Sequence, residues 1–324
     1  MLGSTFDDTT TEAHAGLRLD VYLAGAIEDV SRSIIQKLIK DGLVEVNGVV
    51  CKKPGRTVAA NERVTAILPT PPSSDLTPQA IPLSILYEDS DLLVIDKPSG
   101  LVVHPAPGHS DGTLVNAVLY HCPDFQRPGD DLGRPGIVHR LDRFTSGVMV
   151  VAKSHVAFAG LAEQAREHTF DRRYLALVRG EFKENVGRIN ASVGRSLHDR
   201  GRMSVTGVNA RDAITRFEVL ERFRVASLVS LVLETGRTHQ IRVHMRFAGH
   251  PVLGDPVYGV TEFGKWDVPD SLLEALNALE GQALHAERLG FTHPVSKERL
   301  TFTADPPADF QRTLEALRAL HSSR

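Results

Sequence analysis

Residues 137–147 read Ile-Val-His-Arg-Leu-Asp-Arg-Phe-Thr-Ser-Gly, and residues 148–152 follow as Val-Met-Val-Val-Ala. A short apolar run next to turn-forming residues is typical of a buried strand, and the small residues 145–147 predict a tight turn before it. Asp142 therefore stands just ahead of a rigid strand. This order predicts a carboxylate held at the edge of a cleft, where it could act on a negatively charged substrate.

Two arginines flank this acid in the sequence. Arg140 and Arg143 would favour the ionised form of Asp142, because a nearby positive charge stabilises a carboxylate. An ionised and positioned carboxylate can be a nucleophile, a base or a metal ligand. These residues alone leave an alternative of equal weight, in which Asp142 is a structural acid in a surface ion pair.

Length and composition predict a soluble two-domain protein of the cytoplasm. A chain of 324 residues can build a core of normal size, and its two cysteines, Cys51 and Cys122, form no CxxC motif. No run approaches the roughly 20 apolar residues that span a membrane, and residues 1–15 lack the basic region of a signal peptide. The net charge of −3 argues weakly against a general nucleic-acid coat protein but permits a local basic groove.

Prolines divide the chain. Five of them fall within residues 69–82, where they exclude a helix interior or a central strand. We therefore predict a disordered tail over residues 1–15, a small domain over 16–68, a linker over 69–82 and a large domain over 83–324.

The small domain is predicted to combine helices with a hairpin. Ser31 is a good N-cap for a helix whose apolar residues repeat at helical spacing. Asn47-Gly48 between two apolar runs favours a type I′ turn. The basic residues would then line the solvated edge of a small α+β domain.

The large domain alternates short apolar runs with amphipathic segments. Strands are predicted at residues 92–96, 148–152, 174–178, 215–219, 227–234, 284–291 and 300–303, and helices at 113–121, 155–169, 238–248, 271–279 and 309–320. Neighbouring strands often follow one another without a crossover helix. This favours an α+β fold with a mixed, largely antiparallel sheet over a doubly wound parallel one.

Two further motifs could carry chemistry. In residues 234–245 a strand ends at a glycine and a helix begins, with Thr238 as the expected N-cap and a helix start that could receive a phosphate. An inward Arg242 on that helix would need an anionic partner; a solvated basic helix is the alternative. Tyr174, preceded by two arginines, could present its ring to a base, although a tyrosine at a strand edge is the simpler interpretation.

Motifs for metals and nucleotide cofactors are missing from the sequence. The closest pairs among the candidate histidines, His104 with His109 and His239 with His244, are five residues apart, which is off-face for a helical zinc pair. The chain has no GxxxxGK[ST] motif and no GxGxxG motif before a helix, and Ser146 lacks a G-x-S-x-G frame. We therefore predict no metal and no cofactor.

Residues 139–147 resemble the signature of the RluA-type pseudouridine synthases. Further blocks follow in that family's order, at residues 93–101, 173–178, 236–242, 254–259 and 282–286. Together they cover about residues 83–305, and the N-terminal domain resembles an S4 RNA-binding domain. The resemblance implies a cofactor-free isomerase that acts on RNA, and we expect a monomer.

The resemblance also implies roles for individual residues. Asp142 would attack the ribose C1′ or otherwise promote cleavage of the N–C1′ bond, and Arg242 would pair with Asp142 and hold it ionised. Tyr174 would stack on the flipped base and act in the final proton removal. Arg140 would enter the RNA helix as the target leaves, and Leu284 would line the uracil pocket. Other substrate contacts are expected from His139, Arg237 and His239. Phosphate contacts of the S4-like domain are expected from Arg32, Lys37, Lys40, Lys52, Lys53 and Arg56.

Residues 101–105 and 111–113 resemble the subgroup that modifies helix 69 of 23S ribosomal RNA. This implies large-subunit ribosomal RNA, or a pre-ribosomal particle, as the partner. Phe144 stands where an acid is frequent in relatives, which bears on substrate preference. Another ribosomal or transfer RNA site and a non-catalytic RNA-binding assembly factor stay open. A hydrolase that uses Asp142 fits less well, because neither a Mg²⁺ site nor a second catalytic carboxylate is apparent.

Overall fold

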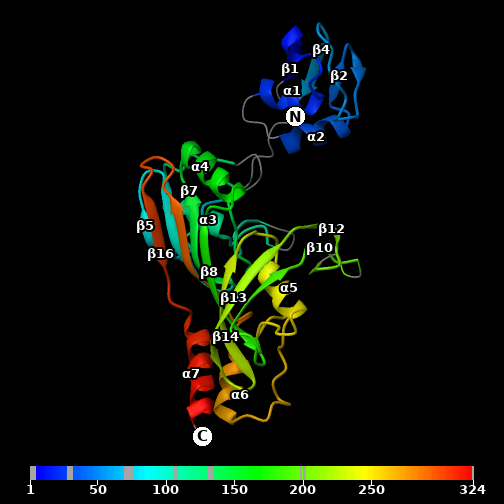
Figure 1. Cartoon of the computed structure of the whole chain (residues 1–324). Coiled ribbons are helices and arrows are strands. Elements are labelled where there is room, and N and C mark those ends of the chain that lie inside the picture. Colours follow the sequence, from blue (N-terminus) through cyan, green and yellow to red (C-terminus); the bar gives the residue numbers. More distant parts are fainter. Residues whose placement is uncertain are drawn as a thin grey trace. The chain divides into compact units, whose positions relative to one another are not determined.

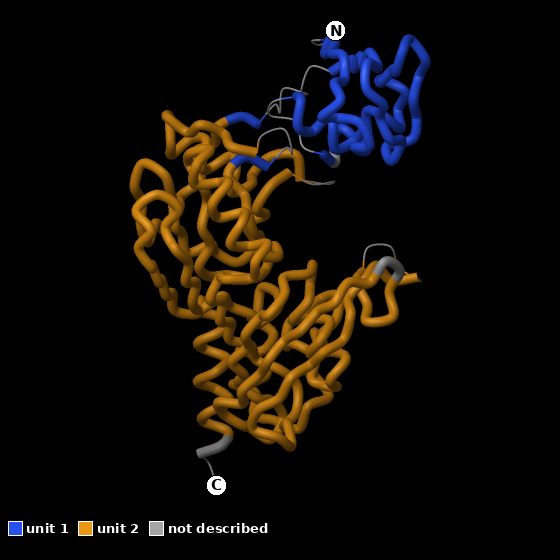
Figure 2. Tube along the Cα trace, turned by 45° about the horizontal axis from the view of Figure 1, so that its top comes forward, with its two compact units in different colours: residues 1–77, 130–135 blue, residues 78–129, 136–324 orange. Residues whose placement is uncertain are grey.

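The structure, a computed structural model of the whole chain, describes residues 5–27, 32–68, 76–105, 109–129, 134–197, 199 and 202–322. It divides into two compact units (Figure 2), residues 1–77 with 130–135 and residues 78–129 with 136–324. The boundary at residue 77 falls within the range predicted as a linker, of which residues 69–75 lie outside the described part. Among the described helices, none has the length and apolar character needed to cross a bilayer.

The first unit is a four-stranded sheet with two helices. Its strands are ordered β1-β4-β2-β3, and its elements are β1 (Thr5–Thr9), a 3₁₀ turn (Glu12–His14), α1 (Leu19–Ala26), α2 (Arg32–Lys40), β2 (Val44–Val46), β3 (Val49–Val50) and β4 (Arg63–Ile67). Apolar residues of both helices pack on the sheet. The predicted hairpin is confirmed: Asn47 and Gly48 have φ of 53° and 77°, as a type I′ turn requires. Ser31, the expected N-cap of α2, lies outside the described residues.

The prediction of a disordered tail over residues 1–15 is wrong for its described part. Strand β1 pairs antiparallel with β4 from Thr5 opposite Ile67 to Thr9 opposite Arg63. Polar contacts fix this edge strand: Tyr22 Oη donates to Asp8 at 2.7 Å. The polar composition of the segment hid the strand, because most of its side chains face solvent and only the pairing partner, more than fifty residues away, shows that it is ordered.

The second unit is built on one large sheet. Its strands run in the order β5-β6-β7-β15-β8-β14-β13-β9, with β16 paired to β15. They are β5 (Ser84–Glu88), β6 (Leu92–Lys97), β7 (Ser146–Ala152), β8 (Asp171–Arg179), β9 (Val186–Asn190), β13 (Ile214–Arg222), β14 (Ala226–Leu233), β15 (Leu284–Thr292) and β16 (Arg299–Thr303). The pairing is antiparallel except between β15 and β7. The prediction of a mixed, largely antiparallel sheet is confirmed.

A second sheet and helices α3 to α7 complete the described part of the unit (Figure 1). The small sheet has the order β11-β10-β12, formed by β10 (Val193–Arg195), β11 (Met203–Ser204) and β12 (Val208–Arg211), and the helices are α3 (Leu114–His121), α4 (His155–Arg166), α5 (Gln240–Phe247), α6 (Asp270–Asn277) and α7 (Ala308–Ser322). Helix α4 shares an apolar core with β6 and β7. Helices α6 and α7 pack together on β8 and β14.

Strand β7 connects the opening motif to this sheet. All seven of its residues are buried, which explains their continuous apolar character. The expected turn at residues 145–147 is wrong for its last two residues, because the strand already begins at Ser146. Gly147 has a φ of 112°, and a Cβ there would lie 2.2 Å from the carbonyl oxygen of Ala286 on the parallel neighbour β15. The glycine is therefore needed for close strand pairing.

Candidate active site

The loop that carries Asp142 is tied to the turn after β6. Lys97, the last residue of β6, is fully buried, and its Nζ donates to the carbonyl oxygens of Pro98, Leu101 and Arg143 at 2.8–3.0 Å. The Gly100 N–H donates to the Arg143 carbonyl as well. The backbone next to Asp142 is thus fixed from the neighbouring strand, a role for Lys97 that the sequence analysis missed.

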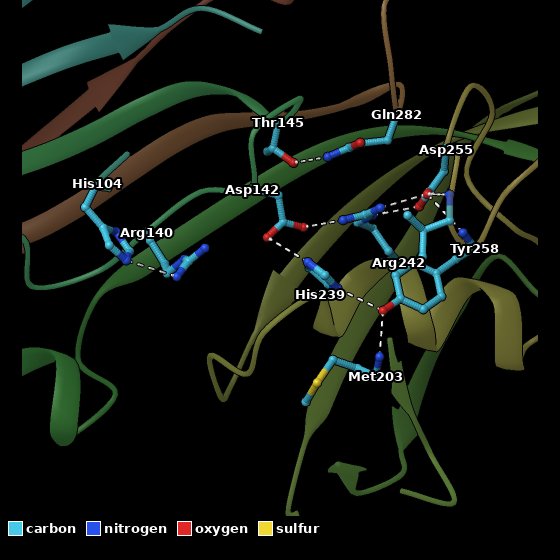
Figure 3. Close-up of polar contacts among 11 residues, drawn as sticks. His104, Arg140, Asp142, Thr145, Met203, His239, Arg242, Asp255, Tyr258 and Gln282 are labelled. Carbon is cyan, nitrogen blue, oxygen red and sulfur yellow. Dashed lines mark hydrogen bonds and ion pairs between the residues drawn. The ribbon is translucent and has the colours of Figure 1, made fainter. Parts of the chain in front are cut away.

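The Arg242 guanidinium bridges two carboxylates (Figure 3). Its Nη1 donates to Asp142 Oδ2 at 2.8 Å, while Nε and Nη2 donate to the two oxygens of Asp255 at 2.7 and 2.8 Å. Arg242 is 5% exposed. The ion pair between Asp142 and Arg242 that the resemblance implied is therefore present, and it joins residues that are a hundred positions apart.

Asp255 is the second carboxylate of this arrangement, and the sequence analysis gave it no role. Its Oδ1 also accepts the N–H groups of Val257 and Tyr258 at 2.9 and 3.0 Å. Burial alone would raise the pKa of this carboxyl, but hydrogen bonds and charge from Arg242 outweigh it and hold the pKa below its ordinary value. Asp255 lies inside residues 254–259, one of the blocks on which the family resemblance rests. Its buried charge fixes the orientation of Arg242 towards Asp142.

The start of α5 differs from the prediction. Thr238 is not the N-cap; His239 holds that position in a left-handed conformation with a φ of 56°. The Gln240 Oε1 accepts from the Arg237 N–H at 3.0 Å and from the Thr235 hydroxyl at 2.9 Å. These two bonds hold the Gln240 side chain against the segment that leads into the helix, and among the described residues no side chain caps the first turn of α5. A non-glycine residue in this conformation costs about 1–3 kcal/mol and often marks a functional site.

His239 lies near Asp142, and Tyr258 lies next to both His239 and Arg242 (Figure 3). His239 Nε2 is 3.8 Å from Asp142 Oδ1, and its Nδ1 is 2.8 Å from Tyr258 Oη. Tyr258 Oη also accepts the Met203 N–H at 2.8 Å, and the Arg242 guanidinium lies 5.0 Å from the centre of the Tyr258 ring. Tyr258, unassigned from the sequence, thus contacts both His239 and Arg242.

Tyr174 lies in β8, buried within the second unit. Burial raises the pKa of its phenol, Arg172 opposes this, and the Asp142 charge adds to it. Tyr174 is therefore a protonated phenol at neutral pH. A phenol presents its ring for stacking, but it must lose its proton before it can act as a base.

Arg140 and His139, which are adjacent in the signature, have different surroundings. Arg140 is exposed, with Nη1 3.4 Å from His104 Nε2. His139 instead accepts the Val150 N–H at 3.2 Å and packs edge-on against Phe170. Burial lowers the pKa of His139 to about 3, with Arg172 acting in the same direction. Arg140 is available to a ligand, whereas His139 anchors the loop to β7 as a neutral ring.

Arg237 and Leu284 are two further residues predicted to contact the substrate. Arg237 Nε donates to the Asp212 carbonyl at 3.1 Å. Leu284, at the start of β15, lines a small cavity together with Phe144 and Gln282. Phe144 packs so closely on Gly281 that a Cβ at position 281 would lie 2.4 Å from the Phe144 Cβ. Gly281 therefore leaves room for the Phe144 side chain.

The predicted basic residues of the first unit fall into two groups. Arg32 pairs with the buried Asp20 at 3.0 Å, and Arg56 makes a two-point contact with Glu62 at 2.6 and 2.8 Å. Four lysines are exposed: Lys37, Lys40, Lys52 and Lys53. The lysines are the more available cations, because the arginines already have carboxylate partners.

One group among the described residues could hold a metal ion. Ligand atoms of Glu88, His121 and Cys122 lie within 4.8 Å of one another. Lys153 Nζ already donates to Glu88 at 2.7 Å, and burial raises the pKa of the Cys122 thiol to about 11. A protonated thiol and a carboxylate paired with an ammonium form a poor preformed site.

Lys97 gives a prediction for stability. Burial lowers its pKa to about 7, against the charges of Asp142 and Asp96, whereas an unfolded lysine titrates near about 10.4. Between these values the unfolded state binds a proton that the folded state lacks, so the unfolding free energy should rise with pH, by about 2 kcal/mol from pH 7 to pH 9. The neutral amine of the folded state keeps two of the three hydrogen bonds that the ammonium donates. Urea unfolding of Lys97→Met should lack this contribution. The exposed Lys265→Met is the control, and an equal pH dependence in Lys97→Met and wild type would contradict the assignment.

Comparison with known proteins agrees with this geometry. Residues 91–247 match the family described as RNA pseudouridylate synthase, and residues 17–64 match the S4 domain. An uncharacterised RNA pseudouridine synthase of Synechocystis is 46% identical over 96% of this chain and 92% of its own length. The ribosomal large subunit pseudouridine synthase D of Zymomonas mobilis is 43% identical over 95% and 96%.

A solved structure shows the same fold. Human RNA pseudouridylate synthase domain containing 4 superposes with a TM-score of 0.56 at 26% identity, covering 72% of this chain and 93% of that one. The high identity to curated relatives over nearly full lengths assigns the family. The chain belongs to the RNA pseudouridine synthases and also contains an S4 domain.

Proposed function

We propose that this RNA pseudouridine synthase modifies uridines of large-subunit ribosomal RNA, with helix 69 of the 23S RNA as the target and Asp142 as the essential carboxylate. The observation that carries the mechanism is the bridge from Asp142 through Arg242 to Asp255. It holds one carboxylate oxygen in place by a nearly buried cation and leaves the carboxylate itself partly exposed, at 17%.

The chemistry follows from this placement. Asp142 attacks the ribose C1′ or otherwise promotes cleavage of the N–C1′ bond, and the freed uracil rotates and rejoins through C5. The Arg242 guanidinium, which donates to Asp142 Oδ2 at 2.8 Å, keeps a positive charge beside this side chain when the polyanionic RNA binds. The isomerisation moves no electrons to an acceptor and adds no group, so these side chains are sufficient without a carrier.

Access to the target uridine requires base flipping. Taking a base out of its stack costs a few kcal/mol, and aromatic stacking returns about 1–3 kcal/mol per base. Tyr174 supplies the stacking surface, Leu284 lines the uracil pocket, and the exposed Arg140 fills the gap that the base leaves. Arg237 and His239 add polar contacts, while His139 acts through the loop rather than on the RNA.

The S4-like domain, over residues 16–68, contacts phosphates of the RNA. The catalytic domain, over residues 83–324, carries out the reaction. The exposed lysines carry these contacts, because phosphates attract solvated cations without reading sequence. Such contacts position the RNA, while the loop around Asp142 selects the reacting nucleotide.

Lys52→Ala should separate binding from catalysis. Lys52 is exposed, and losing one phosphate contact should reduce the slope of log affinity against log salt by about 1. The rate at saturating RNA should not change. Fluorescence anisotropy over a salt series, together with single-turnover kinetics, measures both quantities. A lower saturated rate with unchanged affinity would assign Lys52 to catalysis instead.

Large-subunit ribosomal RNA as the substrate is supported by the relatives that are named ribosomal large subunit pseudouridine synthase D, among them the Zymomonas and Escherichia coli proteins. Mapping of pseudouridine in total RNA from cells with and without this protein tests it directly. We expect helix 69 positions to lose the modification in the deletion strain. Loss of pseudouridine at another ribosomal or transfer RNA site would support the proposed reaction but identify a different target. No lost site would favour an RNA-binding assembly factor.

A further inference from the structure

The mechanism above gives His239 only an unspecified polar contact and gives Tyr258 no role, although His239 lies close to the reacting carboxylate. Arg242 occupies Asp142 Oδ2 at 2.8 Å, and His239 Nε2 lies 3.8 Å from the other oxygen, Oδ1. That separation is too long for a direct hydrogen bond. A single hydroxyl can bridge two groups this far apart, because two hydrogen bonds of about 2.8 Å reach up to about 5.6 Å.

The hydrogen bonds around Tyr258 bear on which ring nitrogen of His239 carries the proton. A phenol has one proton to donate. The Met203 N–H donates to Tyr258 Oη at 2.8 Å, which fills one acceptor position of the oxygen and leaves the phenol proton available to His239 Nδ1, also at 2.8 Å. With Nδ1 as acceptor, a neutral imidazole carries its proton on Nε2. The Nε2–H then points to the side on which Asp142 lies.

The surroundings keep this ring neutral. Burial is the largest influence and lowers the pKa of His239. Arg242 and Arg140 lower it further, while Asp142 and Asp255 raise it. A neutral ring offers one donor in a fixed direction beside an ionised acceptor.

We propose that His239, with its tautomer set by Tyr258, recognises the ribose 2′-hydroxyl of the target uridine. The hydroxyl accepts from His239 Nε2–H and donates to Asp142 Oδ1, so it lies beside the line that joins these two atoms, within reach of both. It is two bonds from C1′, which places it beside any carboxylate that acts there. A 2′-hydroxyl contact distinguishes RNA from DNA, so His239 is a specificity residue and Tyr258 is a positioning residue. This rests on the proposed role of Asp142.

The test compares two substrates across four proteins. A ribosomal RNA stem-loop is made with either uridine or 2′-deoxyuridine at the modified position, and single-turnover rates are measured for wild type, His239→Ala, Tyr258→Phe and Thr238→Ala. The ratio of the rate with uridine to the rate with 2′-deoxyuridine should fall about tenfold or more in His239→Ala, the loss expected for one hydrogen bond to a specific group. In Tyr258→Phe this ratio should also fall, but by less. The exposed neighbour Thr238→Ala should keep the wild-type ratio.

A second measurement is independent of turnover. Nitrogen-15 NMR of labelled histidine should show the Nε2–H tautomer of His239 in the free wild-type protein, and a mixture of tautomers in Tyr258→Phe. The proposal is overturned if wild type shows the Nδ1–H tautomer. It is also overturned if His239→Ala discriminates as strongly as wild type, including the case in which both proteins leave the 2′-deoxy substrate untouched. Failure of the proposed function looks different, because wild type would then leave the uridine substrate unmodified.

Discussion

Asp142→Asn is expected to abolish pseudouridine formation while RNA binding persists. The rate should fall by at least about four orders of magnitude, the scale on which loss of an essential nucleophile acts. The asparagine oxygen can still accept from Arg242, which in the wild type donates to Asp142 Oδ2 at 2.8 Å. The buried pair of Arg242 with Asp255 is untouched by the change. The loss is therefore chemical rather than structural.

Single-turnover kinetics on a ribosomal transcript, with anisotropy for affinity, measure this effect. The exposed Asp124→Asn, in the same unit, is a matched control that should behave like wild type. Normal turnover by Asp142→Asn would remove the residue from the mechanism. Release of free uracil by wild type, in place of a changed base linkage at constant RNA mass, would identify a hydrolase instead.

Arg242→Ala is expected to damage both turnover and stability. It leaves the fully buried Asp255 without a cation, and an uncompensated buried charge costs about 3–5 kcal/mol. Turnover should fall at least about a thousandfold, because the Asp142 carboxylate loses the donor that orients it. Denaturant unfolding at pH 7 and single-turnover rates measure the two losses.

The pH dependence of the stability loss follows from the Asp255 carboxyl. In wild type its pKa lies below the ordinary value, so it contributes stability above the unfolded pKa, and that contribution disappears as pH falls through the folded pKa. Without Arg242, burial raises the Asp255 pKa instead. The stability difference between wild type and Arg242→Ala should therefore narrow between pH 7 and pH 5.

Two further variants separate folding from catalysis. Arg242→Ala combined with Asp255→Asn removes the buried charge and should recover stability without recovering turnover. Arg246→Ala, on the exposed side of the same helix, should leave the unfolding free energy within about 0.5 kcal/mol of wild type. Recovery of turnover in the double variant would show that Arg242 serves only to neutralise Asp255.

Local chemistry explains what could be predicted from the sequence. Strand β7 follows from a continuous apolar run, and the hairpin at Asn47-Gly48 follows from two residues that tolerate positive φ. Asp142 was located by the order of charge, small residues and strand around it. Each of these depends on neighbours within about ten positions, where steric and hydrophobic preferences act directly.

The features that the sequence analysis misjudged or missed depend on residues that lie far away in the chain. Strand β1 is ordered by β4, and Gly147 serves the approach to β15 rather than a turn. The N-cap of α5 is His239 rather than Thr238, and the Gln240 side chain bonds back to Arg237 in the segment before the helix. Sequence preference alone does not rank such competing partners, because each offers a satisfactory local hydrogen bond.

The sequence by itself determined the sheet type, the family and the carboxylate at the centre of the site. Tertiary structure decided how that carboxylate is held: Asp255, more than a hundred residues after Asp142, fixes Arg242, and Tyr258 sets the ring of His239. The physical reason is that charge pairing and hydrogen bonding act over a few ångströms in space, at distances along the chain that only the folded backbone brings together.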